Sequence, residues 1–253
     1  MEYRNLVFDF THSYPKQFKV QDSFIRLDCS KMRGCVLYCS HLAEAELKRM
    51  IELHGISGIH FIDSGDYHYI TRLMTDYIKE PFSMVLIDHH TDMQKPLTGE
   101  ITSCGNWARE VLENNSYLKQ LVLMGPRQHL IDELDVPDNK EKIIAISYEK
   151  LERRQAKEDF KRIRKDLPVY LSIDKDVLTK RDAVTNWDQG EMTVDMLKHL
   201  LQFLLVECEV IGIDICGEYP NADIIPEYTE AKRINNKTNE ELYAYIMNLL
   251  RRK

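Results

Sequence analysis

Short apolar runs separated by amphipathic stretches constrain the fold of this 253-residue chain more than any other feature. The runs have the length and the Val, Ile and Leu content of buried strands, and the stretches between them repeat apolar residues at helical spacing. They cover residues 6–10, 35–39, 58–62, 84–87, 121–124, 142–147, 169–173 and 210–213. About eight strands alternating with helices predict an α/β fold with a mainly parallel sheet, because parallel neighbours need helical crossovers that cover both faces.

Helix signals fill the segments between the strands. Ser40 is a candidate N-cap, and Gly55 a stop, for the helix between them. The charged residues 149–165 predict a surface helix, and Thr193 is expected to cap another. A capping box at residues 238–241 is expected to open the last helix of the chain.

Composition and charge exclude several classes of partner. The 34 basic and 41 acidic residues give a net charge of −7, and no basic stripe marks a nucleic-acid surface. The amino end lacks the apolar core of a signal peptide and no apolar run would span a bilayer, so no membrane association is expected. Six cysteines without a C-x-x-C pair are typical of a reducing compartment, and a cytoplasmic location is expected. No linker or repeat divides the chain, so residues 1–253 are expected to form one domain.

The segment that follows residues 84–87 carries the clearest chemical signal. Asp88, His90 and Asp92 come directly after this apolar run. Side chains two residues apart point to the same side of an extended backbone, so these three are expected to converge. Two carboxylates and an imidazole suit a hard or borderline divalent cation such as Mn²⁺, Zn²⁺ or Fe²⁺.

A second acidic pair follows another apolar run, since Asp174 and Asp176 share one side of the chain just after residues 169–173. His68 lies in the turn after a third strand, and Glu218 follows a fourth. Ligands of open parallel sheets bind beyond the carboxyl ends of the strands. Carboxylates gathered there would repel one another, whereas two divalent cations would balance them and ionise a bridging water near neutral pH. The implied reaction is metal-assisted hydrolysis.

In these motifs the chain resembles the ureohydrolases, the family of arginase, agmatinase and formimidoylglutamase. The signatures of that family read G-G-D-H-S, D-A-H-x-D and S-x-D-x-D-x-x-D-P. The similar segments, in the same order, are Ser64-Gly-Asp-Tyr-His68, Asp88-His-His-Thr-Asp92 and Ser172-Ile-Asp-Lys-Asp176. The likeness runs from about Gly58 to Pro220 and implies a three-layer α/β/α sandwich around an eight-stranded parallel sheet.

The same resemblance implies two metal positions and their ligands. One ion would be held by His68, Asp88, Asp92 and Asp174, and the other by Asp88, His90, Asp174 and Asp176. Asp88 and Asp174 would bridge the two divalent cations, and Mn²⁺ is the usual metal of the family. Ureohydrolases commonly assemble as trimers or hexamers, so a homo-oligomer is one expectation.

The chain also departs from the family pattern. Tyr67 stands where the first signature has its histidine, and Thr179-Lys180 replace the last Asp-Pro of the third. The loop Ser103-Cys-Gly-Asn-Trp-Ala108 carries no histidine to shuttle protons. The closing family motif D-x-x-E-x-N-P, whose glutamate grips a guanidinium, resembles Asp214-Ile-Cys-Gly-Glu-Tyr-Pro220, in which Glu218 comes one place late. Arginine or agmatine as the substrate is therefore not implied.

The leading hypothesis is a metal-dependent hydrolase of a carbon–nitrogen bond in a small-molecule guanidine, amidine or amide, with Asp92 and Glu218 as catalytic candidates. Two other hypotheses stay open. A deacetylase-like hydrolase would hold one zinc ion with Asp88, His90 and Asp174. A catalytically inactive relative would keep its metals to stabilise a binding or regulatory module. The plainest alternative for the aspartates is capping of the turns that follow the strands.

Overall fold

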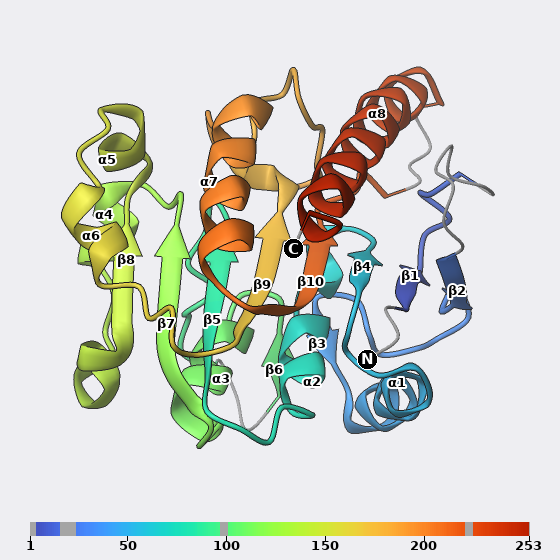
Figure 1. Cartoon of the computed structure of the whole chain (residues 1–253). Helices are drawn as coiled ribbons and strands as arrows, with labels where there is room; N and C mark the ends of the chain where they lie inside the picture. Colours follow the sequence, from blue (N-terminus) through green and yellow to red (C-terminus); the bar gives the residue numbers. More distant parts are fainter. Residues whose placement is uncertain (1–3, 16–23, 97–100, 221–224, 253) are drawn as a thin grey trace.

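The computed structural model describes residues 4–15, 24–96, 101–220 and 225–252. An eight-stranded sheet whose neighbouring strands are all parallel runs through the molecule (Figure 1). In spatial order its strands are β2 (Phe24–Asp28), β1 (Asn5–Asp9), β4 (Ile59–Ile62), β10 (Val210–Cys216), β9 (Val169–Asp174), β5 (Phe82–Ile87), β7 (Leu118–Met124) and β8 (Ile143–Ile146). The parallel sheet predicted from the apolar runs is confirmed.

Helices cover both faces of this sheet. One apolar cluster joins the sheet to α1 (His41–His54), α2 (Ile70–Thr75) and α3 (Trp107–Asn114). A second cluster joins the opposite face to α5 (Tyr148–Glu152), α6 (Lys157–Lys161), α7 (Val194–Glu207) and α8 (Ile225–Leu250). Shorter helical segments are α4 (Gln128–Asp132) and the 3-10 turns Gly65–Tyr67, Pro137–Lys142 and Lys175–Val177. The three-layer α/β/α sandwich is confirmed.

The central strand β5 shows why polar groups gather at its end. Val85 and Ile87 join the cluster under α7 and α8, whereas Met84 and Leu86 join the cluster under α1 and α2. Both faces of the strand are therefore buried, as expected for a parallel sheet covered on two sides. Asp88 is the first polar residue after this run, and it emerges at the carboxyl edge of the sheet.

The predicted helix caps are present. The Ser40 hydroxyl accepts the N–H of Ala43 at 3.3 Å at the start of α1, and Gly55 ends that helix with a φ of 79°. The Thr193 hydroxyl accepts the N–H of Met196 at 3.2 Å at the start of α7. Each cap satisfies a backbone donor that the helix itself leaves without a partner.

Two predicted helices have the wrong extent. Residues 149–165 form two short helices, α5 and α6, because Arg154 adopts a left-handed φ of 56° between them. The final helix does not open at the capping box, since α8 begins at Ile225 and runs through Thr238. The hydroxyl of Thr238 instead donates to the carbonyl of Asp182, so it ties the middle of α8 to a loop.

Three strand predictions also need correction. Of residues 35–39 only β3 (Tyr38–Cys39) is a strand, and it pairs antiparallel with β6 (Thr102–Ser103) outside the main sheet. The eighth strand of the sheet is β2, an edge strand whose partial exposure hides the apolar pattern. Strand β10 continues to Cys216, so Asp214 lies inside the strand and not after it.

No helix in the described ranges is both long enough and apolar enough to cross a membrane. The longest of them, α8, alternates buried positions such as Leu242 and Ile246 with exposed charged residues. This pattern is that of a helix packed on the sheet by one face.

Packing of α7 on the sheet yields a stability prediction. Leu201 is fully buried in this helix, whereas Val206 on the same helix is 53% exposed. We expect Leu201→Ala to lower the free energy of unfolding by about 2–5 kcal/mol through lost burial and a cavity. Val206→Ala is the matched control and should change it by less than about 0.5 kcal/mol. Urea unfolding followed by circular dichroism measures both, and similar losses for the two variants would contradict this packing.

Candidate metal centre

The predicted ligands come from strands that are neighbours in the sheet. Asp88 follows β5, Asp174 ends β9, and these two strands pair directly. His68 comes after β4 through the 3-10 turn Gly65–Tyr67, and β4 is separated from β9 by β10 alone. All of them reach the carboxyl edge of the sheet, where ligand sites of parallel sheets are built.

One group of donor atoms surrounds the His68 imidazole. Its Nδ1 lies 3.3 Å from Asp88 Oδ2, 3.2 Å from Asp92 Oδ2 and 3.5 Å from Asp174 Oδ2. Two ligands about 2.1 Å from a shared ion lie about 3.0–3.5 Å apart at octahedral or tetrahedral angles. The spacing of these four side chains therefore fits one divalent cation.

A second group lies beside the first. His90 Nδ1 is 2.9 Å from Asp176 Oδ2 and 3.6 Å from Asp88 Oδ1. Asp88 thus turns one oxygen to His68 and the other to His90. The ring of His89, between these residues, lies against Gly190, and its backbone N–H donates to Asp176 Oδ1 at 3.1 Å.

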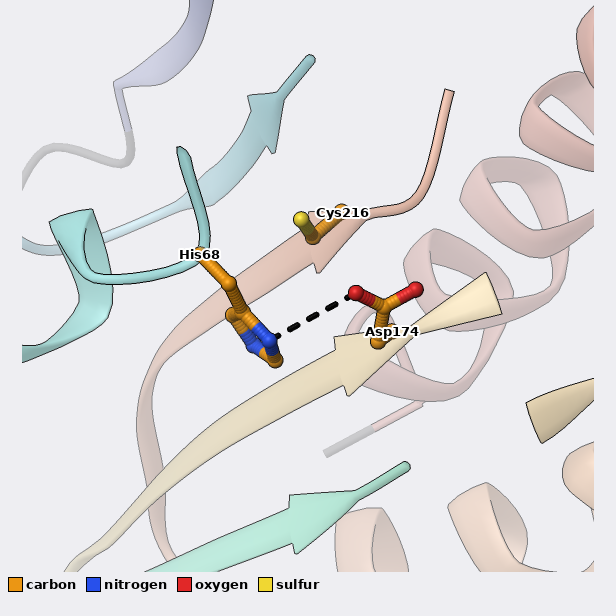
Figure 2. Close-up of side chains that lie close together, drawn as sticks. All are labelled: His68, Asp174 and Cys216. Atoms are coloured by element: carbon orange, nitrogen blue, oxygen red, sulfur yellow. Dashed lines mark ion pairs between the residues drawn. The ribbon is translucent and has the colours of Figure 1, made fainter. Parts of the chain in front are cut away.

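Neighbouring side chains fix the orientation of His68. Its Nε2 hydrogen bonds to the Ser172 hydroxyl at 2.8 Å, and its ring packs 4.8 Å from that of Trp107. A proton on Nε2 that is donated to Ser172 would leave the Nδ1 lone pair available for a metal ion among the carboxylates. One residue inserted in the first signature therefore still delivers an imidazole nitrogen to the cluster (Figure 2).

The backbone and an indole hold Asp92 in place. Its φ of 51° is left-handed, a conformation that aspartate tolerates better than most residues. Its carbonyl accepts the N–H groups of Ala108 and Arg109 in the first turn of α3. Trp107 Nε1 donates to Asp92 Oδ2 at 2.5 Å. The loop after β5 is thereby tied to the start of α3.

Three of the four carboxylates are held in an environment that opposes their charge. Burial, followed by the charge of Asp88, raises the pKa of Asp174 to about 6 and also raises the pKa of Asp92. Burial and the charge of Asp174 raise the pKa of Asp176 well above its usual value. Crowded buried carboxylates ionise together only when positive charge is placed among them.

The two imidazoles supply part of that positive charge. Burial lowers the pKa of His90, but its contacts with Asp176 and Asp88 outweigh burial and raise that pKa to about 12. Burial likewise opposes the charge of Asp88, and hydrogen bonds from His68 and His90 still hold its pKa below the usual range. A cluster of carboxylates that favours the protonated form of a neighbouring imidazole would also favour bound divalent metal ions.

A cavity of about 510 Å³ opens over both groups. Its lining includes Asp88, His90 and Asp92, the side of Trp187 and the buried thiol of Cys104. Burial, with a contribution from the charge of Asp92, raises the pKa of that thiol, so it stays protonated at neutral pH. The cavity is large enough for a small-molecule ligand.

Farther from the metal ligands, the wall of the cavity carries one basic and one acidic side chain that pair with each other. Lys95 Nζ and Asp135 Oδ2 form an ion pair of 2.5 Å, and both side chains are more than half exposed. Trp187 lies on the wall next to His90, with 6.0 Å between the ring centroids. Its Nε1 donates to Asp66 Oδ1 at 2.9 Å, so Asp66 positions the indole and does not face the metal ligands.

Comparison with known proteins shows the family to which this chain belongs. The model of the Arginase family matches residues 46–234. The chain belongs to the arginase family. Membership supports a hydrolase of the ureohydrolase type at the level of the family, and it confirms the resemblance seen in the sequence motifs.

The comparisons also find individual proteins that are similar to this chain in sequence or in fold. An uncharacterised protein of Thermotoga maritima is 29% identical over 193 residues, which cover 75% of this chain and 69% of that protein. Agmatine ureohydrolase of Thermoplasma volcanium has the same fold, with a TM-score of 0.67 at 14% identity over 99% of this chain and 90% of its own. A hypothetical agmatinase from Burkholderia thailandensis gives a TM-score of 0.59 at 19% identity over 83% of this chain. The match spans 64% of that agmatinase, which is therefore a longer protein.

The structure does not bring Glu218 to the cavity, although the arginase-family pattern predicts a substrate-reading glutamate near this position. Its side chain is 1% exposed and accepts from Lys175 Nζ. Asn239 of α8 donates to the same carboxylate oxygen at 2.7 Å and accepts from Lys175 at 2.9 Å. In this position Glu218 neutralises a buried lysine and is not among the residues that line the cavity.

Gly217 explains the displacement. Its φ of 91° is left-handed, and a Cβ at this position would lie 2.5 Å from Asp174 Oδ1. Only glycine allows the chain to turn this close to a predicted metal ligand. Asp214 is also removed from the centre, because it lies inside β10 and bonds to His60 at 2.8 Å and Tyr170 at 2.9 Å.

The sequence prediction missed the roles of Lys175 and Trp187. A signal for Lys175 was present, since it stands between Asp174 and Asp176 and must point to the opposite, buried side. A lysine is almost never fully buried unless it is paired. No comparable signal marked Trp187, whose place on the cavity wall depends on a long loop.

Removing one partner of the buried pair tests this arrangement. Lys175→Met leaves Glu218 charged and unpaired, so we expect the free energy of unfolding to fall by about 3–5 kcal/mol. The double variant Lys175→Met with Glu218→Gln should recover part of this loss, because no buried charge then remains. The exposed pair Lys165–Glu207, with 2.7 Å between its charged atoms, is the matched control, and Lys165→Met should cost less than about 1 kcal/mol. Equal losses at positions 165 and 175 in urea unfolding would contradict the buried pair.

Proposed function

We propose that the chain is a hydrolase that cleaves a non-peptide carbon–nitrogen bond of a small-molecule guanidine, amidine or amide with two divalent metal ions. The position of Asp88 carries this proposal. One of its oxygens faces His68 and the other faces His90, which is the arrangement of a carboxylate shared between two ions. Membership of the arginase family supports the same class of reaction.

The proposal assigns the ligands to two positions. His68, Asp88, Asp92 and Asp174 would hold the first ion, and Asp88, His90, Asp174 and Asp176 would hold the second. When bound, the ions would supply a metal-activated water as the nucleophile. Carboxylate-rich donor sets suit Mn²⁺, which is the predicted metal.

Asp92 is the proposed residue for proton handling. Its side chain lines the cavity, so it reaches the space where a substrate would lie. Its Oδ2 is held by the Trp107 indole, which leaves Oδ1 to take a proton and deliver it to a leaving nitrogen. The loop where relatives carry a shuttle histidine lines the cavity here with Ser103 and Cys104.

The geometry favours two ions over the single zinc of the deacetylase-like hypothesis. That alternative requires Asp88, His90 and Asp174 to share one ion. His90 Nδ1 instead lies nearest to Asp176, at 2.9 Å, and His68 forms a separate group with Asp88 and Asp92. The cavity of about 510 Å³ over these groups favours an enzyme over an inactive module.

Metal content per chain tests the proposal directly. After loading with Mn²⁺ and removal of the excess, mass spectrometry should find about two ions per chain. Asp88→Ala should leave less than one ion, because it removes a ligand of both positions. His89→Ala is the matched control and should keep two, since its side chain lies outside both groups. One ion or none in the wild-type protein would contradict a two-metal centre.

Asp92→Asn tests the proton-handling role. The amide oxygen can still accept from Trp107 and face the first metal position, so the metal content should stay near two. Without an ionisable group, we expect kcat to fall by about 10²–10⁴-fold, the usual contribution of a general acid or base. Turnover would be followed as ammonia, urea or amine released from a panel of guanidines, amidines and amides. If the Asn variant turned over substrate at the wild-type rate, Asp92 would not be the group that handles the proton.

A further inference from the structure

Apolar side chains gather on the wall of the cavity that opens over the metal ligands. Three of the large apolar side chains that the structure leaves exposed, Leu37, Tyr38 and Trp187, line this cavity. Leu130 of α4 and Leu134, which follows that helix, line it as well. Exposed apolar residues that are scattered singly need no explanation, whereas a group of them in one hollow is typical of a site that binds an apolar ligand.

The indole of Trp187 is held in place beside the metal ligands. Its Nε1 donates to Asp66 Oδ1 at 2.9 Å, and the backbone N–H of the same residue donates to the Thr185 hydroxyl at 3.3 Å. A Cβ at Gly65 would lie 2.8 Å from Trp187 Cδ1 and 3.2 Å from Asp174 Oδ2, so the indole and this carboxylate lie against the same glycine. A ligand group that contacts the indole from the cavity would therefore lie next to the proposed metal positions.

The backbone also fixes the segment that carries Leu37 and Tyr38. Leu37 has a left-handed φ of 63°, which leucine rarely adopts. Its carbonyl accepts the N–H of Cys104 at 2.9 Å, and Tyr38 pairs with Ser103 between β3 and β6. Unfavourable backbone conformations persist only where the surrounding structure enforces them, and they cluster at ligand sites. The two apolar side chains are thus presented to the cavity from a backbone of fixed conformation.

The charges along the cavity balance one another. Apart from the metal ligands, its charged lining residues in the described part of the chain are Lys95, Arg109, Glu133 and Asp135. Lys95 pairs with Asp135, and Arg109 Nε pairs with Glu113 at 2.8 Å. The four ligand carboxylates would likewise balance two divalent cations in formal charge. These residues therefore offer no excess of either charge to attract a cationic or an anionic substrate.

We propose that the substrate is an uncharged amide that carries an aromatic or other planar apolar group, and that Trp187 determines specificity by contacting this group. The inference rests on the proposed hydrolase function and narrows its substrate class. Hydrolysis of such an amide breaks the bond between the carbonyl carbon and the nitrogen, and it joins that carbon to the oxygen of water. The products are a carboxylic acid and ammonia or an amine, and no atom is oxidised or reduced.

Binding of three small probes to the full-length protein loaded with Mn²⁺ tests the substrate class without reference to turnover. Benzamide has a ring and a neutral amide, propionamide keeps the amide but lacks the ring, and benzamidine keeps the ring but is positively charged. Equilibrium dialysis should give a Kd for benzamide at least about 10-fold lower than for the other two. Propionamide buries less apolar area, and benzamidine finds no uncompensated negative charge. Propionamide or benzamidine binding as tightly as benzamide would overturn the inference.

Variants of Trp187 test the residue that reads the ring. Trp187→Ala should weaken benzamide binding by about 10-fold and leave propionamide binding unchanged, and Trp187→Phe should restore most of the affinity because it keeps an aromatic ring. Tyr117→Ala is the matched control: Tyr117 is 36% exposed and Trp187 37%, but Tyr117 does not line the cavity, so its loss should leave benzamide binding unchanged. An equal loss of affinity for both amides in Trp187→Ala would indicate a structural role and contradict the proposed specificity.

The outcomes separate this inference from the function on which it rests. A protein that holds two ions without preferring benzamide overturns the substrate class and leaves the hydrolase proposal intact. A protein that prefers benzamide but holds no ion overturns the hydrolase proposal, and with it the claim that the ligand is a substrate. The affinities of the wild-type protein decide the substrate class even if a variant fails to fold.

Discussion

Four buried aspartates are crowded together at the carboxyl edge of the sheet. The arrangement of the groups around them depends on this crowding. Asp88, Asp92, Asp174 and Asp176 are each at most 8% exposed. Carboxylates packed this closely repel one another, and only positive charge among them makes the arrangement stable. Protonated His68 and His90 can supply that charge when no ion is bound, and the two proposed ions would replace those protons, because imidazole binds a metal in its neutral form. Neighbouring groups orient the ligands: Ser172 hydrogen bonds to Nε2 of His68, and Trp107 holds one oxygen of Asp92.

Much of this was readable from the sequence because it depends on strict periodicity. Strands β5 and β9 are apolar on both faces, and a polar residue immediately after such a run must emerge at the edge of the sheet. The two-residue period also predicted that Asp174 and Asp176 share one side, although Asp176 lies in the 3-10 turn Lys175–Val177 and not in an extended segment. The sequence did not show how close the ends of different strands lie to one another. His68 reaches Asp88 only because β4, β10, β9 and β5 lie in that spatial order, and no local pattern encodes that order.

The wrong predictions share a cause, which is that tertiary contacts overrode a local signal. The capping box at Thr238 has the correct residues, yet its hydroxyl donates to Asp182 while α8 continues past it. The charged run after residue 148 is helical in composition, but a left-handed residue at Arg154 divides it. Glu218 has the right type and nearly the right position for a substrate contact. Its carboxylate is instead held by Lys175 and Asn239, so it does not line the cavity.

The departures at Lys175 and Glu218 are best understood as one coupled change. A lysine between two metal ligands points into the interior, where it requires an anion. A glutamate displaced by the extra Gly217 also points into the interior, where it requires a cation. Neither residue is tolerable alone, and together with Asn239 they satisfy one another. In the arginase-family pattern a glutamate near this position grips a guanidinium, whereas Glu218 bonds to Lys175 and does not line the cavity. The buried pair therefore supports the chain behind Asp174 and Asp176, and under the proposed function the metal positions would be kept while a guanidinium contact by Glu218 would not.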